Sequence, residues 1–209
     1  METQGITMNR KVTLYLMALL TLCTMSVNAA LDIRTWDDPD TGYKWYYWYV
    51  NGTQRIYNAS DRAAISPSPS GTVIVPSSLN AVAIDGGAFL NCSEITRIII
   101  PDSVTAIDPS AFRGCSGLYS ISVSPNNPNY KTTSGFLLTK DGTKLIGGIN
   151  GNVTIPSGVT NIGSSAFWGH NLTSVTIPDS VTIIGYGAFY NCDELASVTI
   201  PDSVVMSIG

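Results

Sequence analysis

The chain has 209 residues, with 11 Lys and Arg against 15 Asp and Glu and a formal net charge of −4. Charged residues make up 12% of the chain, about half of the usual share in soluble proteins. The basic residues form no cluster, which argues against nucleic acid as a partner, because phosphate binding needs gathered positive charge.

The first 30 residues have the pattern of a secretory signal peptide. Arg10 and Lys11 precede an apolar run over 12–25, and Val27 and Ala29 provide the small residues of a cleavage site after Ala29. A membrane-spanning helix is less favoured, because the run is shorter than the roughly 20 residues that a bilayer requires. We therefore expect a signal peptide over 1–30 and a secreted or cell-surface protein.

An aromatic-rich segment without repeats follows over 31–71. Its pattern predicts a β-hairpin over 45–57 with an Asn-Gly turn at 51–52. We interpret the segment as an N-terminal cap that covers the apolar end of the next domain. Alternation along a strand places Trp45 and Trp48 on opposite faces. The alternative is therefore that one face caps the domain while the other stacks on a glycan.

From residue 72 onward, a phrase built on Ala-Phe occurs four times. Its marker residues are Phe89, Phe112, Phe167 and Phe189. The first two are 23 residues apart and the last two 22, whereas the middle gap of 55 leaves room for a repeat and an insertion. This period lies in the leucine-rich-repeat range and predicts a solenoid of stacked windings over 72–209. We expect the four rings to form one internal ladder.

Each repeat also holds a strand phrase in which apolar residues alternate with polar ones. These phrases predict strands over 72–75, 95–100, 118–123, 172–177 and 195–200. A proline usually ends the strand, because it has no N–H for the ladder. A second short extended run follows, as at 159–163 and 181–185, and the Ala-Phe stretch predicts a short helical or 3-10 corner.

One repeat position, three residues after each marker Phe, holds Cys92, Cys115, His170 and Cys192. We interpret it as a buried column of small side chains, with a Cys92–Cys115 disulfide as the alternative. His170, the only His in the chain, is then a core substitution rather than a ligand or base. A single His excludes most His-centred catalytic triads and His-rich metal sites. We expect no metal site, no cofactor and no enzyme activity.

Residues 125–151 interrupt the repeats. Two apolar runs at 136–139 and 143–146 flank a Lys-Asp-Gly turn, which predicts a hairpin within this insertion. Near residue 209 the sequence shows no counterpart to the N-terminal cap. Either the sequence is a piece of a longer protein or its last winding is exposed, and in the second case we expect self-association through the uncapped C-terminal end.

The segment from Leu172 to Cys192 reads LTSVTIPDSVTIIGYGAFYNC. It resembles the repeat of the BspA-like leucine-rich repeat family, the Treponema pallidum type, which occurs on bacterial surface proteins and in some protists. The resemblance covers about residues 72–209, and the segment 125–146 is similar to an insertion familiar in that family. It implies adhesion to host or matrix proteins, or to neighbouring cells.

The outward-facing strand positions form the candidate binding surface, a flat face that is mostly hydroxyl-bearing. The residues that we select on it are Arg97, Ile99, Tyr119, Ser122, Thr176 and Thr199. Arg97 and Tyr119 are the strongest anchors, because Arg and Tyr are enriched at interface hot spots. The alternative is that these positions only suit β-strands. The leading hypothesis is a non-catalytic protein-binding module, and the second is a glycan- or cell-wall-binding protein that uses Trp45 and Trp48.

Overall fold

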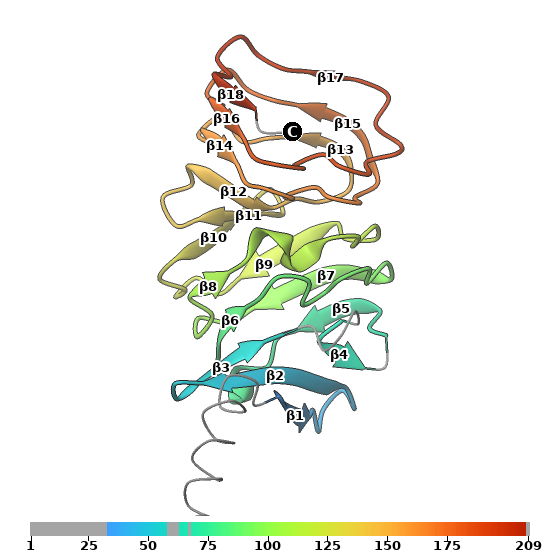
Figure 1. The fold of residues 1–209 in the computed structure, drawn as a ribbon, viewed down its shortest axis with the longest axis vertical. Helices are drawn as coiled ribbons and strands as arrows, with labels where there is room; N and C mark the ends of the chain where they lie inside the picture. Colours follow the sequence, from blue (N-terminus) through green and yellow to red (C-terminus); the bar gives the residue numbers. More distant parts are fainter. Residues whose placement is uncertain (1–32, 58–62, 67, 208–209) are drawn as a thin grey trace, which may run out of the picture.

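The computed structural model describes residues 33–57, 63–66 and 68–207. They form a β-solenoid whose windings stack along the long axis of the molecule (Figure 1). The helical content of these residues is two short 3-10 segments, η1 (Ser77–Leu79) and η2 (Pro109–Phe112). The expected repeat solenoid of short strands is confirmed, whereas the expected signal peptide over 1–30 lies outside the described residues.

Each winding has three sides. The proline side carries the strands that precede the prolines, which are β5 (Gly71–Ile74), β7 (Ile95–Ile100), β9 (Ser120–Val123), β13 (Gly151–Thr154), β15 (Leu172–Thr176) and β17 (Val198–Thr199). The short-strand side carries β3 (Thr53–Ile56), β6 (Ala81–Ile84), β8 (Ala106–Ile107), β12 (Lys144–Gly147), β14 (Asn161–Ile162), β16 (Ile183–Ile184) and β18 (Met206–Ser207). The Ala-Phe side carries the four marker turns, of which only that of Phe112 is a 3-10 helix.

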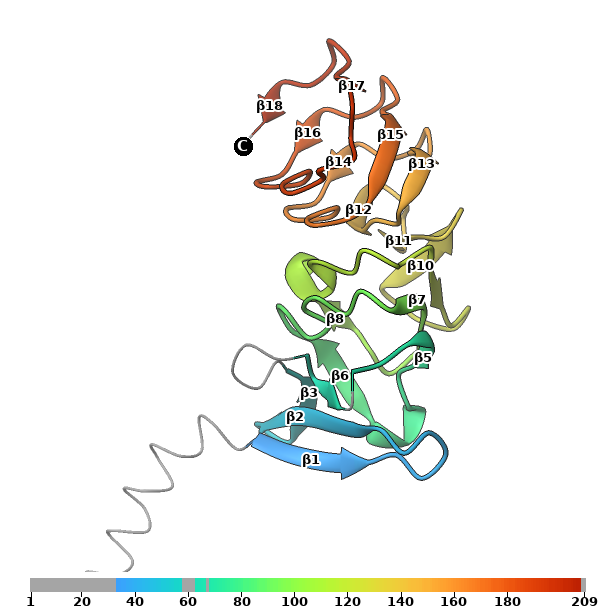
Figure 2. The same ribbon diagram turned by 90° about the vertical axis from the view of Figure 1, so that its right-hand side faces the viewer.

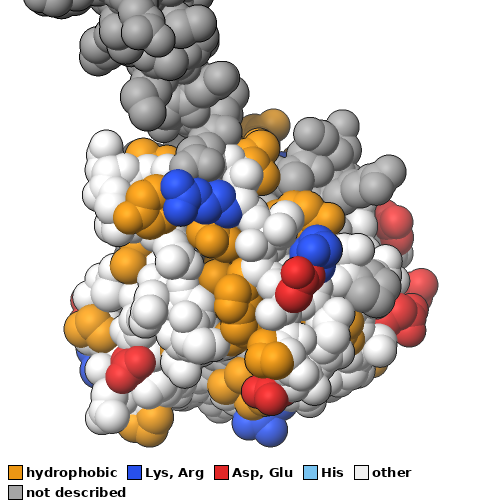
Figure 3. Space-filling model, turned by 90° about the horizontal axis from the view of Figure 1, so that it is seen from below, with side chains coloured by type: hydrophobic (Ala, Val, Ile, Leu, Met, Phe, Trp, Pro, Cys, Tyr) orange, Lys and Arg blue, Asp and Glu red, His pale blue; other side chains and the backbone are white. Residues whose placement is uncertain are grey.

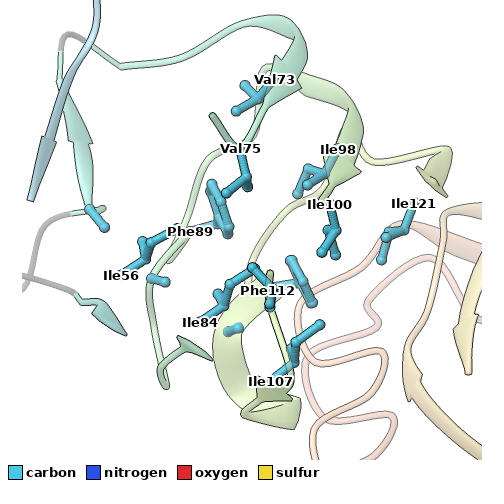
Figure 4. Close-up of a cluster of buried hydrophobic side chains, with 14 of the residues drawn as sticks. Ile56, Val73, Val75, Ile84, Phe89, Ile98, Ile100, Ile107, Phe112 and Ile121 are labelled. Atoms are coloured by element: carbon cyan, nitrogen blue, oxygen red, sulfur yellow. The ribbon is translucent and has the colours of Figure 1, made fainter. Parts of the chain in front are cut away.

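Apolar side chains from all three sides fill the inside of the coil. On the proline side, Val73, Ile98 and Ile121 occupy one register position of β5, β7 and β9, and all three are buried. Figure 4 shows these side chains pointing inward toward the rings of Phe89 and Phe112. A winding buries its apolar face only against its neighbours, so the stack itself is the source of stability.

The marker rings stack in two pairs rather than in one ladder. Phe89 and Phe112 lie nearly parallel with centroids 5.7 Å apart, and Phe167 and Phe189 do so at 5.2 Å. The first pair belongs to one core cluster and the second pair to another. The expectation of one continuous ladder is therefore wrong, because the inserted chain passes between Phe112 and Phe167.

A glycine pair makes that passage possible. A Cβ on Gly147 would lie 3.1 Å from Cδ2 of Phe112, and a Cβ on Gly148 would lie 2.2 Å from Cδ1 of Phe167. Only residues without side chains fit between the two rings at this spacing. Bare backbone thus lies between the rings of Phe112 and Phe167, while β11 (Phe136–Thr139) and β12 contribute side chains to both clusters.

The insertion adds strands β10 (Tyr130–Thr133) and β11 (Phe136–Thr139) and leads into β12. Strands β11 and β12 are antiparallel, as the sequence indicated, and β12 then runs parallel to β14. The turn between β10 and β11 lies beside β9, where the Ile121 N–H donates to the Gly135 carbonyl over 2.8 Å. The proline side is therefore split into two three-stranded sheets, β5-β7-β9 and β13-β15-β17.

The aromatic-rich N-terminal segment continues the coil. Strands β1 (Ile33–Asp37), β2 (Lys44–Val50) and β4 (Ile65–Ser66) pair antiparallel around β2, and β2 and β3 form the expected hairpin through the 51–52 turn. Strand β3 also runs parallel to β6. Strand β3 therefore belongs to a first winding that lacks the repeat phrase, near the bottom of Figure 2.

The ring of Trp45 completes this first winding. The Ala64 N–H donates to the Ala88 carbonyl, as the Phe89 N–H donates to the Ala111 carbonyl one winding later. Ala64 thus holds the place of a marker Phe but brings no ring. Trp45 from β2 packs its indole edge-on against Phe89, with centroids 6.3 Å apart.

In the cysteine column, Cys92 and Cys115 are buried, and Cys192 is half-buried. Cys92, Cys115 and Cys192 are free, so the alternative of a disulfide is not realised. The thiol of Cys115 lies 3.1 Å from the Phe89 carbonyl, and that of Cys192 lies 3.0 Å from the Phe167 carbonyl. Burial raises the pKa of the Cys92 thiol to about 12 and that of Cys192 to about 11, which keeps these thiols protonated and unreactive.

Candidate functional site

The β5-β7-β9 sheet brings four of the six selected strand residues to one surface. Arg97 on β7 donates from Nη2 and Nε to the Ser122 hydroxyl on β9, over 2.8 and 3.2 Å. Within the described part of the chain, no carboxylate pairs with the Arg97 guanidinium. Ser122 therefore orients the Arg97 guanidinium. The remaining N–H groups of the guanidinium can still donate to a planar acceptor group.

Apolar side chains lie on the same sheet as Arg97 and beside that sheet. Ile99 follows on β7 and is half-buried, and it pairs in register with Ile74 on β5. Ile74 is 53% exposed, and Tyr119, just before β9, is 61% exposed. Sequence reasoning did not select Ile74, although its apolar side chain at an outward position was a visible signal. We call Ile74, Arg97, Ile99, Tyr119 and Ser122 the anchor patch.

Thr176 and Thr199 lie on the other sheet of the proline side. They are exposed and in register with each other and with Thr154 on β13. Their neighbour Ser174 donates to the Asn152 side chain over 2.5 Å. The expected single flat face is thus two faces, one with a cation and apolar anchors and one built of hydroxyl and amide groups.

The N-terminal tryptophans do not form an exposed platform. Trp45 is 0% exposed and belongs to the core, so it is not available to a ligand. Trp48 is half-buried and packs on Tyr57, with ring centroids 4.0 Å apart. Figure 3 views this end of the molecule, where apolar side chains are interspersed with polar ones and one basic side chain touches an acidic one.

A second group of aromatic residues, on the Ala-Phe side, was missed from the sequence. Trp168 and Tyr190 directly follow marker Phe residues and stack on each other with centroids 4.3 Å apart. The Arg113 guanidinium covers the other face of Trp168, with its Cζ 3.5 Å from the ring centroid. The signal was present in the phrase itself, since the residue after each marker Phe shares one outward position.

Metal-binding chemistry has no support in this part of the molecule. Across residues 33–57, 63–66 and 68–207, no three His, Cys, Asp or Glu side chains gather in a way that could hold an ion. His170 is fully buried in the cysteine column, 6.3 Å from Phe167 between ring centroids. In the same described ranges, no helix is long and apolar enough to cross a membrane.

Comparisons with known proteins agree with the geometry. A family model described as the BspA type leucine rich repeat region matches residues 70–139 and 149–209 in six copies. The crystal structure of a leucine-rich repeat protein from Eubacterium ventriosum is similar, with 34% identity and a TM-score of 0.57, over 66% of this chain and 38% of that one. No similar protein was found among curated sequences.

Two further structures show weaker likeness. A leucine rich cell surface protein from Faecalibacterium prausnitzii shares 32% identity over 59% of this chain and 34% of that one, with a TM-score of 0.49. A leucine rich repeat protein from T. pallidum shares 22% over 85% of this chain and 62% of that one, with a TM-score of 0.37. The present chain spans well under half the length of the Eubacterium and Faecalibacterium proteins.

Proposed function

Because this chain belongs to the BspA-type leucine-rich repeat family, whose repeats form interaction modules, we propose that it is a non-catalytic, secreted or cell-surface protein that binds other proteins through its anchor patch. The partners are host, matrix or neighbouring-cell proteins, and the role is adhesion. The pattern of a signal peptide in residues 1–30 supports the location.

The observation that carries the proposal is the state of Arg97. Its guanidinium is exposed, oriented by Ser122 and without a carboxylate partner among the described residues. Ile74 and Tyr119 expose apolar surface on the same sheet and beside it. An interface hot spot, in which a few residues supply most of the binding energy, is typically rich in Arg and Tyr.

Thr176 and Thr199 have a lesser part in this proposal. Their sheet offers hydroxyl groups but no exposed cation or aromatic ring on its strands. Such residues form the energetically near-neutral contacts that surround a hot spot. We assign them to the margin of the interface.

Capture of purified extracellular-matrix proteins and of intact cells by the immobilised full chain tests the proposal. The Arg97→Ala/Tyr119→Ala variant is expected to weaken capture by more than about tenfold, which corresponds to about 1.4 kcal/mol. The matched control is Thr176→Ala/Thr199→Ala, which changes two exposed residues of the neighbouring sheet and leaves capture nearly unchanged. Equal capture by wild type and the Arg97→Ala/Tyr119→Ala variant would contradict the assigned surface.

A further inference from the structure

Two rows of outward side chains cross the β5-β7-β9 sheet. The first row is Thr72, Arg97 and Ser120, and the second is Ile74, Ile99 and Ser122. The side chain of Arg97 leaves its own row to bond Ser122 in the other. The guanidinium therefore lies at the β9 end of the row that begins with the two isoleucines.

The hydrogen bonds of Arg97 leave one edge of its guanidinium open. A guanidinium carries five N–H groups in one plane. Nε and Nη2 each donate to the Ser122 hydroxyl, over 3.2 and 2.8 Å, so Ser122 occupies the edge that these two nitrogens share. The edge between Nη1 and Nη2 has no acceptor among the described residues. It presents two nearly parallel donors, which fit the two oxygens of one carboxylate.

The surroundings of this open edge are neutral. Arg97 is the one charged residue in the six strands of the proline side. Glu94 and Asp102 lie at the corners before and after β7, and neither pairs with Arg97. Ile74 is 53% exposed and Ile99 is half-buried beside it. One cation thus stands next to an aliphatic surface.

We propose that the anchor patch binds a protein segment in which the carboxylate of an Asp or Glu lies beside an aliphatic side chain. This inference rests on the proposed protein-binding role of the same patch and names the chemistry of its partner. The carboxylate takes the open edge of Arg97, and the aliphatic side chain packs on Ile74 and Ile99. Because Ser122 already holds the guanidinium in place, less conformational entropy is lost when the carboxylate binds.

The charge of the patch favours a carboxylate over a phosphate group. A phosphorylated side chain carries a charge of about −1.5 to −2 at neutral pH, and proteins usually recognise it with a cluster of arginines. The strands of the proline side offer no second cation beside Arg97. The net charge of −4 also repels strongly acidic polymers. The patch is therefore matched to a single carboxylate in an otherwise neutral segment.

Selection of a phage-displayed library of random peptides on the immobilised full chain tests the proposal. Counter-selection on the Arg97→Ala variant removes peptides that bind elsewhere. The selected peptides are expected to carry Asp or Glu next to Ile, Leu or Val. Fluorescence anisotropy with a selected peptide then measures the Kd. Exchange of its acidic residue for the matching amide is expected to weaken binding to the wild type about tenfold or more.

Two further variants test the geometry of the contact. Arg97→Lys keeps the charge but loses the pair of parallel donors, and Ser122→Ala releases the guanidinium from its position. Each is expected to weaken binding of the acidic peptide several-fold. Thr176→Ala is the matched control, since it changes an exposed residue of the neighbouring sheet, and it leaves binding unchanged. A peptide with phosphoserine in place of the acidic residue is expected to bind no more tightly than the carboxylate.

The inference is overturned if selection yields no peptide that depends on Arg97, if the amide peptide binds as tightly as the acid, or if the phosphoserine peptide binds more tightly than both. The proposed function fails in a different way. Loss of matrix-protein capture in Arg97→Ala/Tyr119→Ala, without a preference for carboxylate peptides, would reject this inference alone. Unchanged capture by that variant would reject the proposed function.

Discussion

The guanidinium of Arg113 lies over the indole of Trp168, with its Cζ 3.5 Å from the ring centroid. The two residues stand 55 positions apart in the chain, one beside Phe112 in the first core cluster and the other beside Phe167 in the second. The Gly114 N–H donates to the Trp168 carbonyl directly behind this contact. The Ala-Phe side therefore joins the two parts of the solenoid, whereas the proline side is interrupted there.

Replacing Arg113 tests how much this contact contributes. We expect Arg113→Ala to lower the free energy of unfolding by about 1–2 kcal/mol, since a partly desolvated cation–π pair contributes on that scale. Arg113→Lys should retain only part of this stabilisation, because an ammonium keeps the positive charge but lacks the planar face of a guanidinium. Urea denaturation of a double-mutant cycle with Trp168→Ala measures the coupling. Strictly additive losses would show that the two side chains do not interact.

The stacked ring pairs predict a large loss when one ring is removed. Phe112 is 1% exposed and packs on Phe89, so Phe112→Ala should cost about 3–5 kcal/mol through lost burial and the cavity left behind. Chemical denaturation gives the value. Tyr119→Ala, at an exposed aromatic residue, should stay within about 0.5 kcal/mol. A loss below about 1 kcal/mol for Phe112→Ala would be incompatible with an internal ring pair.

The passage of the insertion between the two ring pairs depends on Gly148. A methyl group there would lie 2.2 Å from Cδ1 of Phe167 and 2.8 Å from the Ala166 carbonyl oxygen, so Gly148→Ala should destabilise the fold by about 1–3 kcal/mol or more through overpacking. The thermal midpoint reports the change. Gly158→Ala is the matched control, because nothing lies within 4 Å of its added Cβ. Similar midpoints for both variants would contradict the close approach.

Acid should destabilise the protein through His170. Burial lowers the pKa of His170 from 6.5 to about 4 in the folded chain. The unfolded chain therefore binds the proton first, and stability is retained above about pH 6.5 and lost as the pH falls toward 4. A shift of this size corresponds to about 3 kcal/mol. Urea denaturation between pH 7 and pH 4 measures it.

The His170→Cys variant isolates this contribution, because it installs the residue that the other three repeats carry at this position. Carboxylates titrate in both proteins, so the difference between the two pH profiles belongs to the imidazole. Wild type should lose more stability toward pH 4 than the variant. Parallel profiles would mean that the histidine is solvated in the folded state.

The sequence predicted the local features of the repeat well. Alternation around Ile98 and Val175 predicted which side chains point inward, and Pro101 predicted the end of β7. Strand β15 ends at Thr176, one residue before the end that Pro178 predicted. These features depend on neighbours a few residues away, so a single chain is enough to recognise them. The selected residue Arg97 was placed outward for the same reason.

The sequence predicted the candidate site only in part. Nothing in the sequence indicated that Trp45 would fill the place of a missing ring beside Phe89, because that contact joins two segments with no common pattern. The stack of Arg113 on Trp168 likewise spans the insertion, whose path was unknown. Self-association through the C-terminal end stays a prediction.

The sequence by itself determined that the chain winds, with about 23 residues to a winding, and that Phe, Ile and Cys face the inside. A repeat fixes these choices because each copy places the same side chains at the same step of the backbone. Only the tertiary structure decided that the coil divides at Gly147 and Gly148 into two packed cores and that the proline side becomes two separate faces. That division depends on how an inserted segment packs between windings, a long-range steric fit that no local period encodes.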